Sequence, residues 1–373
     1  MSLTEAGCRG RRERLMETVE KEFGTNFVVI SNPRHIFYLT GYFSSQLTLG
    51  GWGNNHLVLD GDRSTLVIHN FFGPEPTTVF VDEFASWKWY DGATDAGTMM
   101  FPDGVKQLNK HLKTGQRIGV EIGWFPLGAA VGIEETIDIT PTILRMRRHK
   151  DADELMLIRE AIAAVEAGHR AAREVIKPGL TELAVYNAVY NAIVEQAGHA
   201  VLPLGDFAGH KRKEGEASSS MASRHVLQAG ELMILDIYPI VNGYRADFTA
   251  TVSTDGHLTE QQKALESALH EAQARGEEKL KPGTPAREVY QAVRDGMPDF
   301  AEFFTHHAGH GLGLGHPEAP FFVPGSDEIV LAGDVVTLEP GAYGEGFAAR
   351  IEHNYLITED GYERLTNQKT SFA

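Results

Sequence analysis

The sequence predicts an α+β fold in two domains, of which the second is a duplicated α/β unit. A length of 373 residues corresponds to about two domains, and 42% hydrophobic with 23% charged residues is the composition of a globular protein. Short strand-like apolar runs alternate with helical patterns in the first part of the chain, and one helix-and-strand pattern occurs twice in the second part. We therefore expect domains at 1–146 and 147–373.

The charge balance and the cysteine count exclude several classes of protein. Asp and Glu outnumber Lys and Arg by 51 to 34, a net charge of −17, whereas nucleic acids and anionic membranes favour basic partners. The one cysteine, Cys8, can form neither an internal disulfide nor a thiolate zinc site. No apolar run approaches the roughly 18 residues of a membrane helix, and the charged start has no signal-peptide core. We expect a cytoplasmic protein with no nucleic-acid and no membrane partner.

The first domain is predicted as a mixed α/β domain. Its helical patterns lie at 15–23 and 105–112, and its strand patterns lie at 27–31, 56–59, 64–69, 77–81 and 117–122. The segment 141–151 holds four Lys or Arg residues and is expected to be a solvated connection to the second domain.

Two helices are predicted at the start of the second domain. Asp151 and Glu154 form a capping-box pattern before the first helix, and the pair Pro178-Gly179 ends it. Thr181 is expected to cap the second helix. The apolar stripes expected to face inward are Leu155, Ile158, Ile162 and Val165 on the first helix, and Leu183, Tyr186, Tyr190 and Ile193 on the second.

An internal repeat organises this domain. Segments 177–189 and 281–293 are identical at seven of thirteen positions and lie 104 residues apart. Segments 229–236 and 332–339 are also similar, lie 103 residues apart and both end in an acidic residue. The period is far too long for a solenoid. It predicts two α/β halves about a pseudo-twofold axis, with equivalent acids meeting at their interface.

Each half contains a hairpin with two acidic residues. In the first, Asn242-Gly243 is a strong turn signal, and a two-residue turn there places Asp247 opposite Tyr238 and diagonal to Asp236.

In the second half, a turn at Glu345-Gly346 would place Glu339 opposite Glu352, unless the segment Pro340-Gly341 introduces a bulge. Four carboxylates would thus converge among apolar neighbours, where like charges either take up protons or bind cations.

A glycine-rich segment, 305–316, supplies a nitrogen ligand, His310. Four carboxylates and one imidazole carry a charge that two divalent cations neutralise. Oxygen-rich ligation with one nitrogen and no sulfur favours Mn²⁺-like ions. Two such ions can share a water, lower its pKa and polarise a carbonyl, so the predicted chemistry is metal-assisted hydrolysis.

These residues resemble the pita-bread metallopeptidases, the superfamily of methionine aminopeptidase, aminopeptidase P, prolidase and creatinase. Segment 32–41 is similar to the start of the creatinase-like N-terminal domain, and 145–150 is similar to the entry of the catalytic domain. The resemblance implies a pita-bread catalytic domain after a creatinase-like N-terminal domain, with two divalent metal ions, Mn first and Co or Zn as alternatives. It implies these ligands: Asp247 and Glu352 bridging the metals, Asp236 chelating one, and His310 with Glu339 holding the other.

The resemblance also indicates residues that bind substrate or carry protons. Arg350 matches the Arg-x-Glu of the prolidase and aminopeptidase P branch, and His306 and His316 lie on the glycine-rich segment. Relatives place a catalytic histidine at the position of Ser219, and their His-Glu-x-Pro motif would put His316 one residue early. A subset of bacterial Xaa-Pro dipeptidase-like proteins also lacks the first histidine.

Other candidates are weaker. His210 and His225 lie near the missing histidine but out of register, and His307 is interpreted as structural. Trp52 is interpreted as a loop anchor, with a substrate wall contributed across a dimer as the alternative.

The implied function is hydrolysis of the Xaa-Pro bond of dipeptides or short peptides, with a metal-bridged hydroxide as nucleophile. Three alternatives stay open: an Xaa-Pro aminopeptidase acting on longer peptides, a creatinase-like hydrolase of a non-peptide C–N bond, and a binding module that has lost catalysis. Relatives of this architecture lead us to expect a homodimer that takes short proline-containing peptides.

Overall fold

The computed structural model describes residues 2–43, 55–70, 79–88, 100–202, 205–211 and 220–373. The chain divides into two compact units, Met1–Arg147 and Arg148–Ala373. Trp52 and Ser219, which the sequence singled out, lie outside the described residues.

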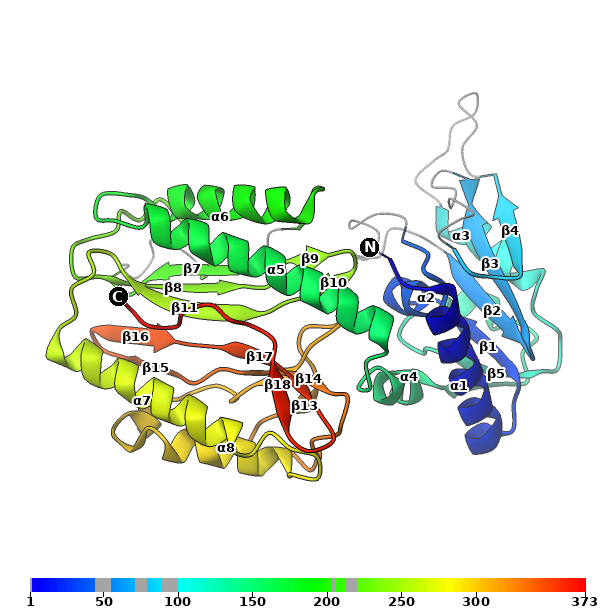
Figure 1. The fold of residues 1–373 in the computed structure, drawn as a ribbon. Helices are drawn as coiled ribbons and strands as arrows, with labels where there is room; N and C mark the ends of the chain where they lie inside the picture. Colours follow the sequence, from blue (N-terminus) through cyan, green and yellow to red (C-terminus); the bar gives the residue numbers. More distant parts are fainter. Residues whose placement is uncertain (1, 44–54, 71–78, 89–99, 203–204, 212–219) are drawn as a thin grey trace. The chain divides into compact units, whose positions relative to one another are not determined.

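The first unit is a six-stranded mixed sheet with helices packed on it (Figure 1). The strand order is β4-β3-β2-β1-β5-β6, with antiparallel pairs between β1, β2 and β3 and parallel pairs elsewhere. Its elements are α1 (Glu5–Phe23), β1 (Phe27–Ile30), α2 (Pro33–Thr40), β2 (His56–Asp60), β3 (Arg63–His69), β4 (Glu83–Trp87), α3 (Met100–Asn109), β5 (Arg117–Val120), β6 (Glu135–Asp138) and α4 (Thr140–Met146).

Most predicted elements of this unit are present, but one predicted strand is wrong. Of the predicted strand 77–81, residues 79–81 are not a strand and residues 77 and 78 lie outside the described residues, and β4 begins only at Glu83. Helix α2 and strand β6 were not predicted. The segment 32–41 forms α2, which Asn32 caps by accepting a hydrogen bond from the Arg34 backbone N–H (3.0 Å).

The segment between the units is not a solvated connection. It contains α4, and Arg147 and Lys150 are only 5% and 4% exposed. Runs of like charge are usually solvated, but here each cation has a different partner. The pairs are Arg145 with Glu22, Arg147 with His35, Arg148 with Asp334 and Lys150 with Glu318.

The second unit begins with the predicted pair of helices and contains four sheets. Its elements are α5 (Ala152–Val175), α6 (Glu182–Ala197), β7 (Gly205–Gly209), β8 (Leu232–Ile237), β9 (Ile240–Val241), β10 (Tyr244–Arg245), β11 (Phe248–Ser253), α7 (Glu260–Glu277), α8 (Ala286–Asp295), β12 (His310–Gly311), β13 (Glu318–Phe321), β14 (Val335–Leu338), β15 (Gly341–Gly344), β16 (Phe347–Arg350), β17 (His353–Ile357) and β18 (Tyr362–Arg364).

The caps of the first two helices are as predicted, and the predicted inward residues Ile158, Ile162 and Val165 of α5 and Ile193 of α6 are buried. The other predicted inward residues are not fully buried. Asp151 and Glu154 form the capping box of α5, and Thr181 caps α6. On α6, Leu183 is exposed, because the buried stripe consists of Val185, Val189 and Ile193. On α5, Leu157 is buried in place of the half-buried Leu155.

The repeat corresponds to two equivalent halves. Each contains a helix pair, α5–α6 or α7–α8, followed by antiparallel strands. The turns inside the two helix pairs match, since Gly179 and Gly283 have φ values of 90° and 88°, a conformation that favours glycine. Their backbone N–H groups donate to the equivalent carbonyls of Leu227 (2.8 Å) and Val330 (2.9 Å).

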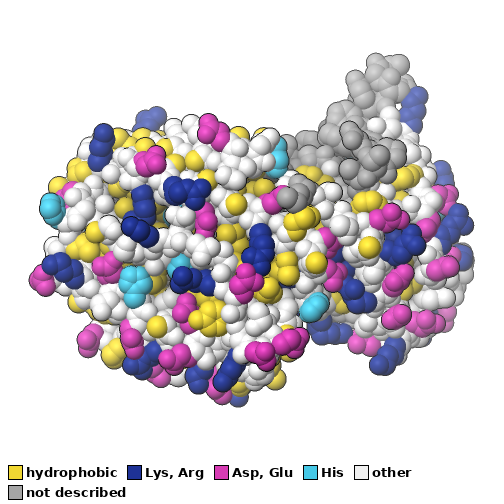
Figure 2. Space-filling model, viewed as in Figure 1, with side chains coloured by type: hydrophobic (Ala, Val, Ile, Leu, Met, Phe, Trp, Pro, Cys, Tyr) yellow, Lys and Arg dark blue, Asp and Glu magenta, His cyan; other side chains and the backbone are white. Residues whose placement is uncertain are grey.

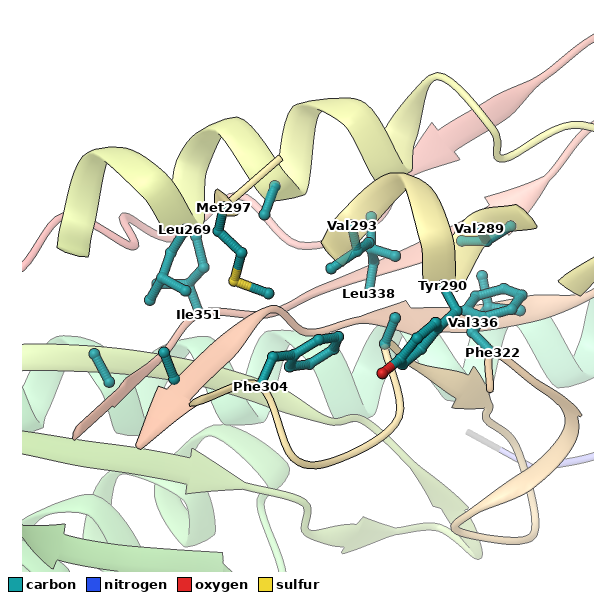
Figure 3. Close-up of a cluster of buried hydrophobic side chains, with 14 of the residues drawn as sticks. Leu269, Val289, Tyr290, Val293, Met297, Phe304, Phe322, Val336, Leu338 and Ile351 are labelled. Carbon is teal, nitrogen blue, oxygen red and sulfur yellow. The ribbon is translucent and has the colours of Figure 1, made fainter. Parts of the chain in front are cut away.

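The helix pairs lie on the outside and the strands between them (Figure 1). In the second half, Leu269 of α7 lies beside Ile351, and Val293 of α8 lies beside Leu338 of β14 (Figure 3). The strands are therefore enclosed by apolar surface, and polar side chains at their ends lie in a dry environment.

Among the described residues, the face of the molecule shown in Figure 2 carries no large basic patch. Lys and Arg side chains are interspersed there with Asp and Glu (Figure 2). Within the described part of the chain, no helix has the length and apolarity needed to span a membrane.

Candidate metal centre

The register of both hairpins brings the four predicted acids together. In the first, Ile240 pairs with Arg245 and Asp236 with Thr249, which continues the predicted register across the break between β8 and β9. Asp236 and Asp247 therefore share a face of the strand pair.

In the second hairpin, Leu338 pairs with His353 and Gly341 with Arg350. The same register on both sides of Pro340 places Glu339 opposite Glu352. The sequence left open a bulge at Pro340-Gly341, and the register shows none there.

Neighbouring hydroxyl groups orient two of these carboxylates. Thr249 donates from Oγ1 to Glu352 Oε2 (2.7 Å), and Thr337 donates from Oγ1 to Glu339 Oε1 (3.0 Å). Three other oxygens of the cluster are buried and have no hydrogen-bond partner among the described residues: Asp236 Oδ1, Asp247 Oδ1 and Glu352 Oε1. Buried oxygens left in this way fit a site built for cations.

His310 presents its second ring nitrogen to the same cluster. Its Nδ1–H donates to the Gly311 carbonyl (2.9 Å), so Nε2 is the ring nitrogen that faces the carboxylates. Nε2 lies 3.5 Å from both Asp247 Oδ2 and Glu339 Oε1. Gly309 permits this approach, because a Cβ there would lie 2.2 Å from the Thr337 carbonyl oxygen.

The pKa shifts show that negative charge on these buried carboxylates is unfavourable without cations. Burial raises the pKa of Asp236 against the opposing effect of Arg350, and burial with Asp247 and Glu339 raises that of Glu352. Burial alone would lower the pKa of His310, but Asp247 and Glu339 raise it to about 9. Protons thus stand in for positive charge, which divalent cations would supply.

All five residues predicted as ligands from the sequence lie in this cluster, and three further histidines join them. Three groups of side chains place one ligand atom each within 4.8 Å of the others. Among the described residues these groups are Asp236, Asp247 and Glu352; Asp247, His310 and His316; and His306, His307 and Glu339. His307, interpreted from the sequence as structural, therefore faces the site.

His316 and His306 occupy different positions around the cluster. His316 Nε2 lies 2.5 Å from Asp247 Oδ2, and its ring stacks on Tyr238 at 4.7 Å. His306 donates from Nδ1 to the His307 carbonyl (2.7 Å), and its Nε2 lies 3.2 Å from Tyr343 Oη. Burial lowers the pKa of His306 to about 4.

Arg350 joins the two hairpins. Its Nη2 pairs with Asp236, and its Nη1 donates to Tyr343 Oη (2.9 Å). Burial would lower the pKa of Arg350, but Asp236 and Tyr343 raise it above the ordinary value.

Three residues of the site were missed in the sequence analysis: Asp206, Tyr238 and Tyr343. Tyr238 follows the ligand Asp236 by two residues, a spacing that places both side chains on one face. Asp206 carries no comparable signal. His210 and His225 bond elsewhere, to the Leu232 backbone and to Glu231, and do not line the cavity.

The cluster opens into a cavity of about 340 Å³. It is lined by Asp206, Asp236, Tyr238, Asp247, His306, His307, His310, His316, Pro317, Glu339, Tyr343 and Arg350. A small ligand would therefore meet carboxylates, imidazoles, two tyrosines, one proline and one guanidinium.

Comparison with known proteins agrees with this geometry. Residues 156–359 match metallopeptidase family M24, and residues 11–149 match the Creatinase/Prolidase N-terminal domain. The chain is 32% identical over 246 residues to "Probable dipeptidase PepE" of Mycobacterium tuberculosis, a match that covers 65% of this chain and only 64% of that protein. It is 26% identical to the Xaa-Pro dipeptidase of Pyrococcus furiosus, over 95% of this chain and 97% of that one.

The fold is also shared with solved structures. The X-Pro aminopeptidase of Thermotoga maritima superimposes with a TM-score of 0.80 at 24% identity, over 97% of this chain and 98% of that one. The family matches together cover both units, and the predicted α+β architecture with a creatinase-like N-terminal domain is confirmed. The chain belongs to metallopeptidase family M24.

Proposed function

We propose that this chain hydrolyses the Xaa-Pro bond of dipeptides or very short peptides with the help of two divalent metal ions. The observation that carries the proposal is the set of buried carboxylate oxygens that lack a hydrogen-bond partner among the described residues and lie around His310, whose Nε2 faces the same acids. The curated names of the Pyrococcus relative, an Xaa-Pro dipeptidase, and of PepE, a probable dipeptidase, support the substrate class.

The residues divide between two ion positions. Asp236 would hold one ion, His310 and Glu339 the other, and Asp247 and Glu352 both. The charge and the oxygen-rich donor set favour Mn²⁺, with Co²⁺ or Zn²⁺ as alternatives. When bound, such ions lower the pKa of a shared water and polarise the scissile carbonyl.

The chain's own side chains supply proton transfer and orientation. His316 is the proton carrier that we propose, because its Nε2 reaches the cluster and its ring, 20% exposed, also faces the cavity. Tyr238 fixes the plane of that ring by stacking on it. Arg350 and the neutral His306 line the cavity and are proposed to orient the substrate. Hydrogen bonds to Tyr343 hold both side chains in position for this role.

The test is proline release from a panel of Xaa-Pro dipeptides and Xaa-Pro-Xaa tripeptides, using chelated protein with and without added Mn²⁺. Metal-dependent release from dipeptides alone is the expected result. Release of the first residue from tripeptides would instead favour an aminopeptidase. No turnover of either class despite two bound metals would overturn the substrate assignment.

Two wider expectations accompany this proposal. We propose a cytoplasmic homodimer, as inferred from the resemblance, and size-exclusion chromatography with light scattering tests the oligomeric state. A monomer with full activity would contradict that part of the proposal without affecting the metal site.

A further inference from the structure

One carboxylate in the cavity has no place in the metal centre. Asp206 lies on β7, directly opposite Asp236 of β8, so the two side chains share a face of the sheet. Asp206 lines the cavity but belongs to none of the three groups of side chains that could jointly hold an ion.

Among the four carboxylates that line the cavity, Asp206 has the most exposed side chain. Its side chain is 26% exposed, against 12% for Asp236, 8% for Glu339 and 4% for Asp247. Among described residues, its one ionic contact is Arg350 Nη2 at 3.7 Å, which is too long for a hydrogen bond.

Arg350 does not satisfy Asp206, because its donors are directed elsewhere. Its Nη2 pairs closely with Asp236, and its Nη1 donates to Tyr343. Like charges directly opposite on paired strands repel each other, so Asp206 opposite Asp236 destabilises the sheet. A cationic group bound by Asp206 would offset this repulsion.

The cation that every unblocked peptide carries is its α-ammonium group. We propose that Asp206 binds the free α-ammonium group of the substrate and so selects peptides whose scissile bond follows the first residue. This inference rests on the proposed function and adds to it a recognition residue outside the metal ligands. The ammonium group donates to the Asp206 carboxylate, while the first carbonyl lies toward the metal centre.

The test compares the variant Asp206→Asn with the wild type, both loaded with Mn²⁺. The substrate is Ala-Pro, and the matched inhibitor is N-propionyl-proline, which differs from Ala-Pro only in lacking the amine. The control is Asp360→Asn, which removes the same charge from an exposed residue in the turn between β17 and β18.

We expect Asp206→Asn to raise the KM for Ala-Pro about tenfold, as for loss of a hydrogen bond between charged groups, with a much smaller change in kcat. The inhibition constant of N-propionyl-proline should change less than about twofold, and both metal ions should remain bound. Asp360→Asn should match the wild type throughout.

Two results would overturn the inference alone. An unchanged KM would show that Asp206 does not contact the amine. Equal weakening of Ala-Pro and N-propionyl-proline, with a fall in kcat, would show that Asp206 acts only by holding Arg350. Failure of the wild type to cleave any Xaa-Pro peptide would instead overturn the proposed function, and this inference with it.

Discussion

At the scale of single residues, the proposed metal centre depends on side chains that orient its ligands without being ligands themselves. The hydroxyl of Thr249 donates to Glu352 Oε2 and accepts from Arg350 Nε (3.3 Å). One side chain therefore orients both the proposed bridging ligand and the arginine proposed to orient the substrate. Because Thr249 is fully buried, no water replaces its hydroxyl when it is removed.

Thr249→Val should therefore weaken Mn²⁺ binding by about tenfold to a hundredfold, the usual cost of losing a group that orients a metal ligand. Valine keeps the shape and removes only the donor. Thr249→Ser, which keeps the hydroxyl, is the matched control and should restore most of the affinity. Isothermal titration with Mn²⁺ measures both, and equal affinity of the Val variant and the wild type would contradict the role.

The ligands themselves should separate into bridging and terminal residues. His310→Ala should lose one metal ion and keep the other, because only one of the two proposed positions uses its Nε2. Glu352→Gln should lose both ions and reduce activity at least about a thousandfold, because both positions use this carboxylate. Metal analysis after dialysis gives the stoichiometry, and two ions retained by His310→Ala would count against its assignment.

At the scale of elements, a buried ion pair fixes the loop that carries His316. Lys150 Nζ lies 2.9 Å from Glu318 Oε1, and the other oxygen of Glu318 accepts from the Gly315 backbone N–H (3.0 Å). The side chains of Lys150 and Glu318 are 1% and 10% exposed. The start of the catalytic unit thereby holds the glycine-rich segment 305–316 in place.

Lys150→Met should destabilise the protein by about 3 kcal/mol, because it removes the ammonium group that pairs with the largely buried Glu318 carboxylate. The double variant Lys150→Met/Glu318→Gln keeps the acceptor for Gly315 and removes the charge, so it should recover part of that loss. Denaturant unfolding of both variants gives the comparison. A double variant as unstable as the single one would show that the pair contributes packing alone.

At the scale of the whole molecule, the sequence predicted best what local rules and the duplication determine. The turn at Asn242-Gly243 gave the correct register, and the repeat gave the two equivalent halves. It predicted least well what depends on tertiary partners. The basic segment 145–150 is partly buried because each cation has a separate acid or histidine partner, which no linear pattern shows.

The missed residues have the same cause. Asp206 lies on a strand outside the repeated blocks, and only the pairing of β7 with β8 brings it beside Asp236. Tyr343 belongs to the site through hydrogen bonds to Arg350 and His306, which no spacing in the sequence indicates. Spacing identifies which residues share a strand face, whereas contacts across sheets require the folded chain.

A buried histidine of the second unit, His169, predicts that this unit loses stability in acid. His169 of α5 donates from Nε2 to the Phe248 carbonyl (2.9 Å), and burial lowers its pKa to about 3 from 6.5. The folded state thus binds this proton more weakly than the unfolded state does. The stability contributed by neutral His169 is fully present above pH 6.5 and is lost as the pH falls toward 3.

The free energy of unfolding should therefore fall by about 1.4 kcal/mol for each pH unit below 6 on account of this residue alone. His169→Gln keeps a donor for Phe248 and cannot take up the proton, so its stability should fall less steeply by that amount. Denaturant unfolding of both chelated proteins between pH 6.5 and 4.5 isolates the difference, since all other titrating groups are shared. Parallel curves would mean that His169 is protonated in the folded state, and that the contact between α5 and β11 tolerates a charge.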